Sequence, residues 1–197
     1  MSGNGSKILI VDIDDVVLDW TASFDKYIRK FHGYDGVPLG ENPKRLPDIL
    51  NCSREKVISI MEEHNTSSRF KNLKNFKDSK ELLLLNTYFE KVYSITSCGK
   101  SDQIRQNRLE NLMVAIPCFI DELICLDFYE HKHEEIIEII NNHKDSEIYM
   151  LDDNVIDIEF AISKGVNGIV YKSAFYDSKG LITVNSCKEF IRYIKSE

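Results

Sequence analysis

Two groups of carboxylates follow apolar runs in this sequence. Asp12, Asp14 and Asp15 follow the run 8–11, and Asp152 and Asp153 follow the run 148–151. Short apolar runs bounded by charge are typical of strands buried on both faces of a parallel sheet. Ligands of such sheets bind outside the carboxyl ends of the strands. The sequence therefore predicts a divalent cation between the two acidic strand ends.

Carboxylates crowded at one sheet edge suit Mg²⁺. This ion prefers oxygen ligands in near-octahedral geometry and keeps waters or substrate phosphate in the remaining positions. Asp12 together with Asp153 or Asp152 supplies suitable ligands, and Asp14 approaches from the loop. Without the ion, repulsion would raise some of their pKa values. A single acid after a strand can simply cap a loop, but two clusters on separate buried strands favour a functional site.

A phosphate-binding turn is predicted between these strands. The strand 92–96 ends in Thr96, and Ser97, Cys98 and Gly99 lead to a helix that begins near Ser101. A hydroxyl and free amides at a strand-to-helix turn can hold phosphate oxygens, and a glycine allows close approach of the backbone. Serine and threonine are also ordinary helix caps, so this signal depends on its position between the acidic strands.

Lys132 stands at the start of a predicted helix, where the helix dipole disfavours a cation. It could neutralise phosphate and keep a nucleophilic carboxylate ionised, or it could be an ordinary solvated lysine. His131 and His133 flank it. Residues two apart on a helix do not share a face, so a histidine pair binding one metal is not expected.

Strands and helices alternate along most of the chain. Strands are predicted at 92–96, 123–126, 148–151, 168–171 and 181–184, and helices at 78–89, 101–112, 134–140 and 156–164, with one more after Ser186. This alternation predicts the α/β class, a three-layer α/β/α architecture around a Rossmann-like parallel sheet.

The segment 20–72 interrupts this alternation directly after the first strand. It holds a predicted helix from Trp20 that ends at Gly33, an irregular stretch 34–51 and a helix capped by Ser53. We expect two parts: a core of residues 1–19 and 73–197, and a small helical cap, 20–72, above the carboxyl edge of the sheet.

Composition restricts the function classes. The net charge of −7 argues against nucleic-acid polymers and anionic membranes as partners. No apolar stretch is long enough to span a bilayer, and the first residues lack the apolar core of a signal peptide. Five cysteines without CxxC spacing favour a reducing, cytoplasmic location, and Cys118 and Cys125 are predicted to be small core residues.

In their order along the chain, these pieces resemble the haloacid dehalogenase (HAD) superfamily of aspartyl-phosphate phosphatases. The sequence DIDDVV at 12–17 is similar to the first motif of that family, Thr96 to the second and Lys132 to the third. LDDNVID at 151–157 resembles the fourth motif, both as a DD pair and as a DxxxD pair through Asp153 and Asp157.

The resemblance implies a role for each matching position. Asp12 would be the nucleophile, and Asp14 the general acid and base, with its backbone carbonyl also on Mg²⁺. Thr96 would bind the transferring phosphoryl oxygens, and Lys132 would steady Asp12 and the phosphate. Asp153 would ligate the metal. The supporting positions would be Asp152 and Asp157 around the ion, and Ser97, Cys98, Gly99 and Asp15 around the substrate.

The sequence also departs from the family pattern. The family often has Gly-Thr after the second aspartate, whereas this chain has Asp15 and Val16 there. Variants of the motif in the family, DxDDT and DxDGV, resemble this sequence. The presence of Asp14 argues against the dehalogenase branch, which lacks that acid. The insertion resembles a small helical cap that closes over the site, with candidate contacts Trp20, Phe24, Arg45 and Arg69. The run that begins at Arg69 also resembles the 5′-nucleotidase branch.

The sequence thus predicts a Mg²⁺-dependent phosphomonoesterase that acts on a small phosphorylated metabolite, with a nucleotide as one candidate. Two alternatives stay open. A signalling receiver domain uses similar residues, but its acids come early in the chain and it has no insertion after the first strand. A catalytically silent phosphate-binding protein would keep the fold without turnover. The choice between a monomer and a homodimer is also open.

Overall fold

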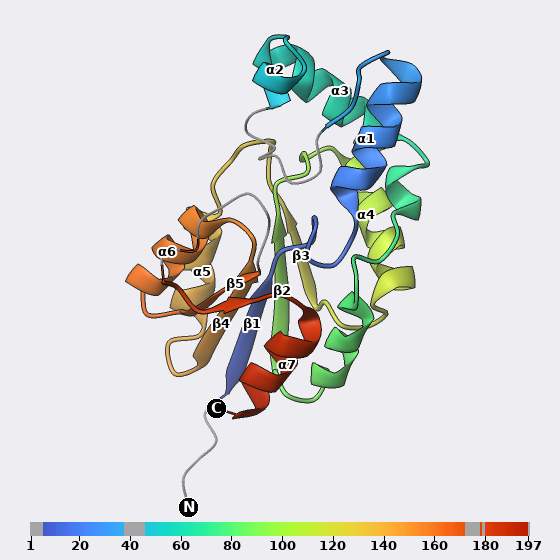
Figure 1. Ribbon diagram of the computed structural model, residues 1–197. Coiled ribbons are helices and arrows are strands. Elements are labelled where there is room, and N and C mark those ends of the chain that lie inside the picture. Colours follow the sequence, from blue (N-terminus) through green and yellow to red (C-terminus); the bar gives the residue numbers. More distant parts are fainter. Residues whose placement is uncertain (1–5, 38–45, 172–177, 179, 197) are drawn as a thin grey trace, which may run out of the picture.

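The computed structural model describes residues 6–37, 46–171, 178 and 180–196 (Figure 1). Its centre is a sheet in the order β3-β2-β1-β4-β5-β6, in which every neighbouring pair is parallel. The α/β prediction is therefore confirmed. The strands are β1 (Lys7–Val11), β2 (Lys91–Thr96), β3 (Glu122–Cys125), β4 (Glu147–Asp152), β5 (Asn167–Tyr171) and β6 (Thr183–Val184).

Helices cover both faces of this sheet. Side chains of β1 alternate between the two faces: Leu9 and Val11 belong to one apolar cluster, and Ile8 and Ile10 to another. The first cluster includes side chains of α4 (Asp102–Ala115), α7 (Cys187–Ser196) and the 3₁₀ helix η3 (Ser79–Leu85). The second includes side chains of α5 (His133–Asn142) and α6 (Val155–Ser163). The predicted three layers are confirmed.

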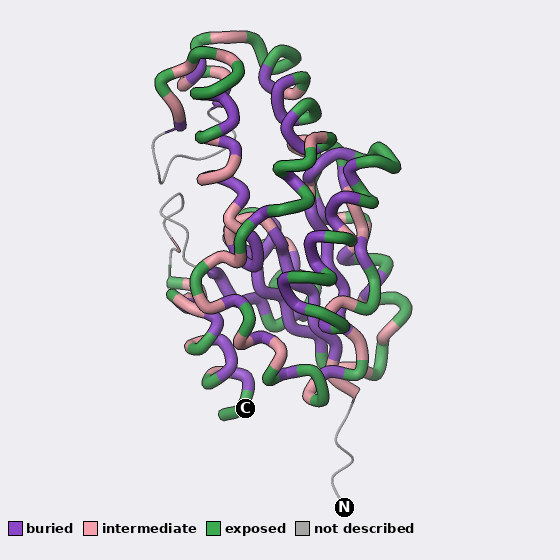
Figure 2. Tube along the Cα trace, turned by 90° about the vertical axis from the view of Figure 1, so that its right-hand side faces the viewer, coloured by how far each residue is buried: buried purple, intermediate pink, exposed green. Residues whose placement is uncertain are grey.

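The insertion after β1 lies beyond the carboxyl ends of the strands (Figure 1). It consists of α1 (Trp20–Phe31), α2 (Leu46–Ile49), α3 (Arg54–Thr66) and the 3₁₀ helix η2 (Phe70–Asn72). Its buried side chains, among them Phe24 and Ile60, join the apolar cluster of α4 and the sheet. In Figure 2 the buried stretches continue from the sheet into these helices.

Local sequence signals set several helix ends. The hydroxyl groups of Ser53 and Ser101 accept hydrogen bonds from the amides of Lys56 (3.3 Å) and Ile104 (3.4 Å), so both serines cap their helices as expected. Gly165 follows α6 with φ +89°, a conformation that favours glycine.

Three local predictions were wrong. The stretch predicted as irregular contains α2, and the strand predicted at 181–184 is limited to β6. The helix predicted at 78–89 is the 3₁₀ helix η3. Its buried residues Ser79, Leu82 and Leu85 are three apart, which is the 3₁₀ repeat, and the Ser79 hydroxyl donates to the carbonyl of Val17 (2.8 Å).

The cysteine prediction was wrong for Cys118 and holds only in part for Cys125, which packs half-buried against the apolar core. Cys118 is exposed in a turn with φ +57°, and Cys125 is half-buried at the end of the edge strand β3, whereas Cys98 and Cys187 are buried. None of the helices in the described ranges has the length and apolar character needed to cross a membrane.

Candidate active site

Asp12 and Asp152 become neighbours through the register of two parallel strands. Val11 pairs with Leu151, and the amide of Asp12 donates to the carbonyl of Leu151 (3.0 Å). The carboxylate oxygens of Asp12, Asp152 and Asp153 include atoms that all lie within 4.8 Å of one another. The fold thus brings the two acidic strand ends together, although they are far apart in the sequence.

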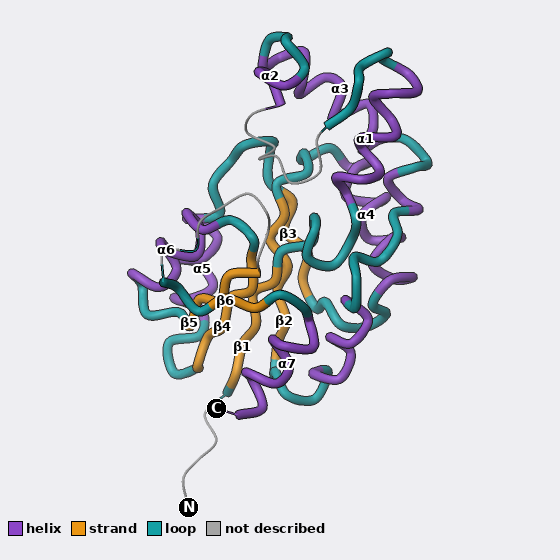
Figure 3. Tube along the Cα trace, viewed as in Figure 1, coloured by secondary structure: helices purple, strands orange, loops and turns teal. Residues whose placement is uncertain are grey.

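Lys132 lies between these carboxylates. Lys132 directly precedes α5 in the chain, at the end of the loop that joins β3 to α5. Figure 3 shows this loop. Nζ of Lys132 donates to Oδ1 of Asp12 and to Oδ2 of Asp152 (2.7 Å). Burial alone would lower the pKa of Lys132, but the charges of Asp12 and Asp152 raise it above its ordinary value. Lys132 is therefore a buried cation held by two acids.

Negative charge is still in excess at this edge. Burial raises the pKa of Asp12 to about 7, with further contributions from Asp152 and Asp14 that Lys132 opposes. Burial, with the charges of Asp12, Asp152 and Asp15, also raises the pKa of Asp153 well above its ordinary value. A divalent cation would relieve this repulsion, and an all-oxygen donor set suits Mg²⁺.

The two acids at the end of β4 differ in their availability to an ion. Both oxygens of Asp152 are engaged, one by Lys132 and the other by the amide of Asn154 (2.8 Å). Neither oxygen of Asp153 accepts a hydrogen bond from the described part of the chain. Asp12 and Asp153 are therefore the side chains best able to hold a metal ion.

Asp14 has a different environment, which sequence reasoning missed. Nη2 of Arg108 donates to both oxygens of Asp14 (2.6 and 2.7 Å), and the hydroxyl of Thr96 donates to Oδ2 (3.3 Å). Arg108 is completely buried in α4. A signal existed: Ile104, Arg108 and Leu112 recur every four residues, which places the arginine on the apolar face of its helix.

The predicted phosphate turn is only partly at the cavity. Ser97 and Cys98 line it, whereas Thr96 lies buried against Asp14. Gly99 has φ +99°, and a Cβ there would lie 2.8 Å from Cδ1 of Ile104. Its amide donates to the carbonyl of Leu126 (2.8 Å). Gly99 is therefore needed for packing, and its amide does not point to a substrate.

Asp15 links the first motif to α1. Its backbone has φ +60°, a region in which aspartate is among the tolerated residues. Its carboxylate accepts hydrogen bonds from the amide (3.1 Å) and the hydroxyl of Thr21. Burial raises the pKa of Asp15 to about 7. Asp15 lines the cavity while tying β1 to the insertion.

The carboxylates open into a cavity of about 150 Å³. Its other wall is largely apolar and includes Trp20, Met61, Phe128 and Tyr129. Of the predicted cap contacts that the structure describes, only Trp20 is in this lining. Phe24 stacks on Trp20 with ring centroids 4.7 Å apart, the guanidinium of Arg69 lies 5.1 Å from the ring of Phe31, and Arg45 lies outside the described residues.

Asn65 connects the insertion to the turn after β2. Its Nδ2 donates to the carbonyl of Cys98 (2.9 Å), and its Oδ1 accepts from Nε1 of Trp20 (3.0 Å). One buried side chain thus fixes the position of α1 and α3 over the cavity.

Asp157 lies beside two histidines. Its Oδ2 accepts from Nδ2 of Asn154 (2.6 Å), and its Oδ1 lies 3.5 Å from Nδ1 of His131 and 3.4 Å from Nε2 of His133. The expectation that the two histidines would not face a common site was wrong. His131 precedes α5, which begins at His133, so helical spacing does not apply to the pair.

By sequence, no family model and no curated protein matches the chain. Solved structures match its fold. A haloacid dehalogenase-like hydrolase from Streptococcus pneumoniae has a TM-score of 0.67 and 14% identity, with 95% of this chain and 98% of that chain covered. A candidate phosphoglycolate phosphatase from Lactobacillus delbrueckii has a TM-score of 0.64 and 14% identity, covering 97% and 98%.

A 2-haloacid dehalogenase from Pseudomonas syringae also matches, with a TM-score of 0.57, 14% identity, and coverage of 97% of this chain and 98% of that chain. The fold of this chain is therefore the HAD fold, which is shared by proteins of different chemistry.

Proposed function

We propose that the chain is a Mg²⁺-dependent phosphomonoester hydrolase of the HAD superfamily. The observation that carries this proposal is the position of Lys132 between Asp12 and Asp152, with Asp153 within 4.8 Å of both acids, at the wall of a cavity. Such a site offers a nucleophile, a fixed positive charge and oxygen ligands in one place.

In the proposed mechanism, Asp12 attacks the phosphorus atom and forms an aspartyl phosphate while the alkoxide leaves. Lys132 holds Oδ1 of Asp12 and neutralises charge on the phosphoryl group. Asp14 lines the cavity but is paired with Arg108 in this structure, so it would leave that pair in order to give a proton to the leaving oxygen and then take one from the water that hydrolyses the intermediate. When bound, Mg²⁺ would supply further charge neutralisation, held by Asp12 and Asp153.

The insertion is proposed to select the substrate. We assign residues 20–72 to a cap over residues 1–19 and 73–197. The wall that includes Trp20, Met61, Phe128 and Tyr129 suits a leaving group with an apolar or planar part, as in a nucleotide. The substrate would then be a small phosphorylated metabolite.

A dehalogenase with the same fold is the main alternative. A dehalogenase displaces a halide with one carboxylate. The dehalogenase branch of the resembling family lacks an acid at the position of Asp14. The additional acids Asp14, Asp152 and Asp153, and the charge excess they create, favour phosphoryl transfer.

The test is the release of phosphate from p-nitrophenyl phosphate. We expect turnover with Mg²⁺, none after chelation, and loss of activity in Asp12→Asn, whereas Asp145→Asn, a change of an exposed acid, should leave activity intact. Turnover that persists in Asp12→Asn would refute the mechanism. Chloride release from 2-chloropropionate without phosphate release would indicate a dehalogenase, and no turnover of any phosphoester would indicate a binding protein.

A further inference from the structure

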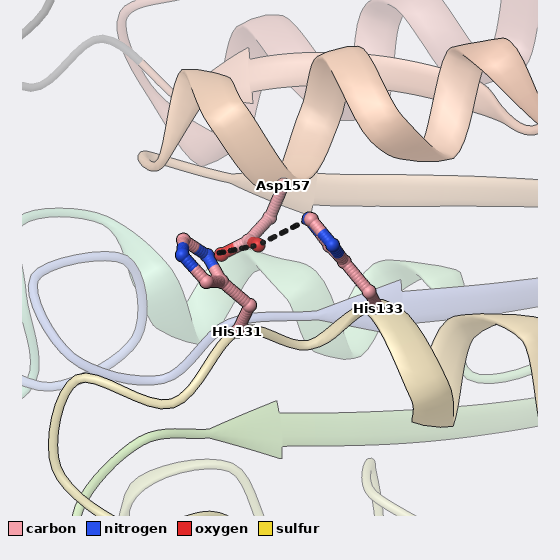
Figure 4. A group of neighbouring side chains, drawn as sticks. All are labelled: His131, His133 and Asp157. Carbon is pink, nitrogen blue, oxygen red and sulfur yellow. Dashed lines mark ion pairs between the residues drawn. The ribbon is translucent and has the colours of Figure 1, made fainter.

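Three side chains beside the proposed active site converge on one point. His131 comes from the loop before α5, His133 from the first residue of α5, and Asp157 from the first turn of α6 (Figure 4). One potential ligand atom of each lies within 4.8 Å of the other two. We propose that His131, His133 and Asp157 bind a transition-metal ion of the Zn²⁺ class. Its ligand atoms are a different group from those of Asp12, Asp152 and Asp153, although His131 and Asp157 line the same cavity. The proposal does not depend on the proposed function.

The distances match the separation of two ligands on one metal ion. Oδ1 of Asp157 lies 3.5 Å from Nδ1 of His131 and 3.4 Å from Nε2 of His133, and Figure 4 shows both rings directed at this carboxylate. Most hydrogen bonds between nitrogen and a carboxylate oxygen are shorter, roughly 2.7–3.2 Å. Ligands of a tetrahedral Zn²⁺ with bonds of about 2.0–2.1 Å are separated by roughly 3.3 Å.

Buried polar atoms without partners support the site. Asp157 is almost completely buried, with 2% of its side chain exposed. Neither its Oδ1 nor Nε2 of His133 has a hydrogen-bond partner in the described part of the chain. Such atoms are costly to bury unless something satisfies them. Since both are directed at each other, an ion between them would satisfy both.

The surroundings fit a metal site. Nδ2 of Asn154 donates to Oδ2 of Asp157 and so fixes the orientation of the carboxylate, as partners of metal ligands often do. The ring of His133 stacks on Phe160 with centroids 3.8 Å apart. His131 keeps 47% of its side chain exposed, which gives solvent access for a water ligand.

The donor types separate this site from the Mg²⁺ site. Two imidazoles and a carboxylate suit Zn²⁺, Co²⁺, Ni²⁺ or Cu²⁺, whereas the acids at the ends of β1 and β4 offer only oxygen. A bound ion would join the residues on both sides of Lys132 to α6. It would thereby restrain the backbone that carries Lys132.

The experiment is a Co²⁺ titration of the whole protein in saturating Mg²⁺, followed by visible absorption and calorimetry. We expect one equivalent of Co²⁺ to bind. His133→Asn should weaken binding at least about tenfold, as should His131→Asn. His143→Asn is the matched control, because His143 follows the far end of α5, where it contacts Tyr93 of β2. This variant should bind Co²⁺ as the wild type does.

Folding and the free cysteines are controlled separately. Circular dichroism checks that each variant is folded, and the half-exposed His131 makes His131→Asn the safer change. Absence of a thiolate charge-transfer band distinguishes these ligands from the five free cysteines. Co²⁺ affinity that is equal in wild type and both histidine variants, or no binding in excess Mg²⁺, would overturn the proposal.

Discussion

At the level of single residues, Asp12 and Asp14 are only two positions apart but have different cationic partners. Asp12 shares Lys132 with Asp152, whereas Asp14 is paired with Arg108, which is completely buried. Removing one partner of a buried ion pair leaves an uncompensated charge, and this is more costly than removing both. The two acids should therefore differ in their contribution to stability as well as in their proposed roles.

We predict that Asp14→Asn lowers the free energy of unfolding by about 3 kcal/mol, because it leaves the Arg108 guanidinium without a carboxylate partner. This is the lower end of the usual range, since 23% of the Asp14 side chain is exposed. Asp12→Asn should cost much less, because it removes a buried carboxylate whose pKa is already raised, and Lys132 keeps Asp152. Urea unfolding in a metal chelator measures both.

The double variant Asp14→Asn with Arg108→Met is the control. It removes both charges, so most of the lost stability should return. Equal losses in Asp12→Asn and Asp14→Asn, or no recovery in the double variant, would contradict this account of the pair.

At the level of elements, the end of α3 joins the insertion to the core. His64 is buried among the rings of Trp20, Phe24, Tyr27 and Phe70, and Asn65 reaches the turn after β2. Helical spacing and the cap at Ser53 predict that α3 exists. They do not predict that a polar pair at its end is buried, because the burial comes from α1 and α4 packing around it.

His64 predicts a pH dependence of stability. Burial lowers its pKa to about 4, against an ordinary value of 6.5. Because the unfolded chain binds a proton more readily, His64 stabilises the fold fully above pH 6.5, and this contribution is lost as the pH falls towards 4. Between pH 7 and pH 5 the loss should be roughly 2 kcal/mol.

The measurement is urea unfolding of wild type and His64→Gln at both pH values. The variant is expected to be less stable at pH 7 but to lose roughly 2 kcal/mol less on acidification than the wild type does. Because the carboxylates titrate equally in both proteins, the difference isolates His64. Parallel pH profiles would show that the imidazole is not buried in this way.

At the level of the whole molecule, the sheet gathers more negative charge at its carboxyl edge than Lys132 compensates. Burial is the first cause of the raised pKa values of Asp12, Asp152 and Asp153, and neighbouring carboxylates raise these values further. Folding creates the cluster, because the strands that carry it come from distant parts of the chain. An ion that binds only the folded cluster must therefore stabilise the fold.

We predict that Mg²⁺ raises the stability of the wild type, by about 2.7 kcal/mol at a concentration 100 times its Kd. Asp153→Asn should respond much less to Mg²⁺, and without metal it should be at least as stable as the wild type, because one of the repelling carboxylates is gone. Urea unfolding with Mg²⁺ or with chelator measures this. An equal gain in both proteins would place the ion elsewhere.

The sequence determined the sheet and the edge at which the acids lie. Continuous apolar runs such as 8–11 and 148–151 are removed from water only when both faces of the strand are buried. Parallel strands place their carboxyl ends at one edge of the sheet. Asp12, Asp152 and Asp153 could therefore be expected to meet, and the position of Lys132 before its helix was visible as an unfavourable charge.

Only the tertiary structure decided which partner each side chain has. The pairing of Asp14 with Arg108 depends on how α4 packs against the sheet, and the contact of His131 and His133 with Asp157 depends on how α5 lies beside α6. Local patterns fix the type of an element and the face that it buries. Side chains brought together by packing have no fixed separation in the sequence, so no spacing rule could have found them.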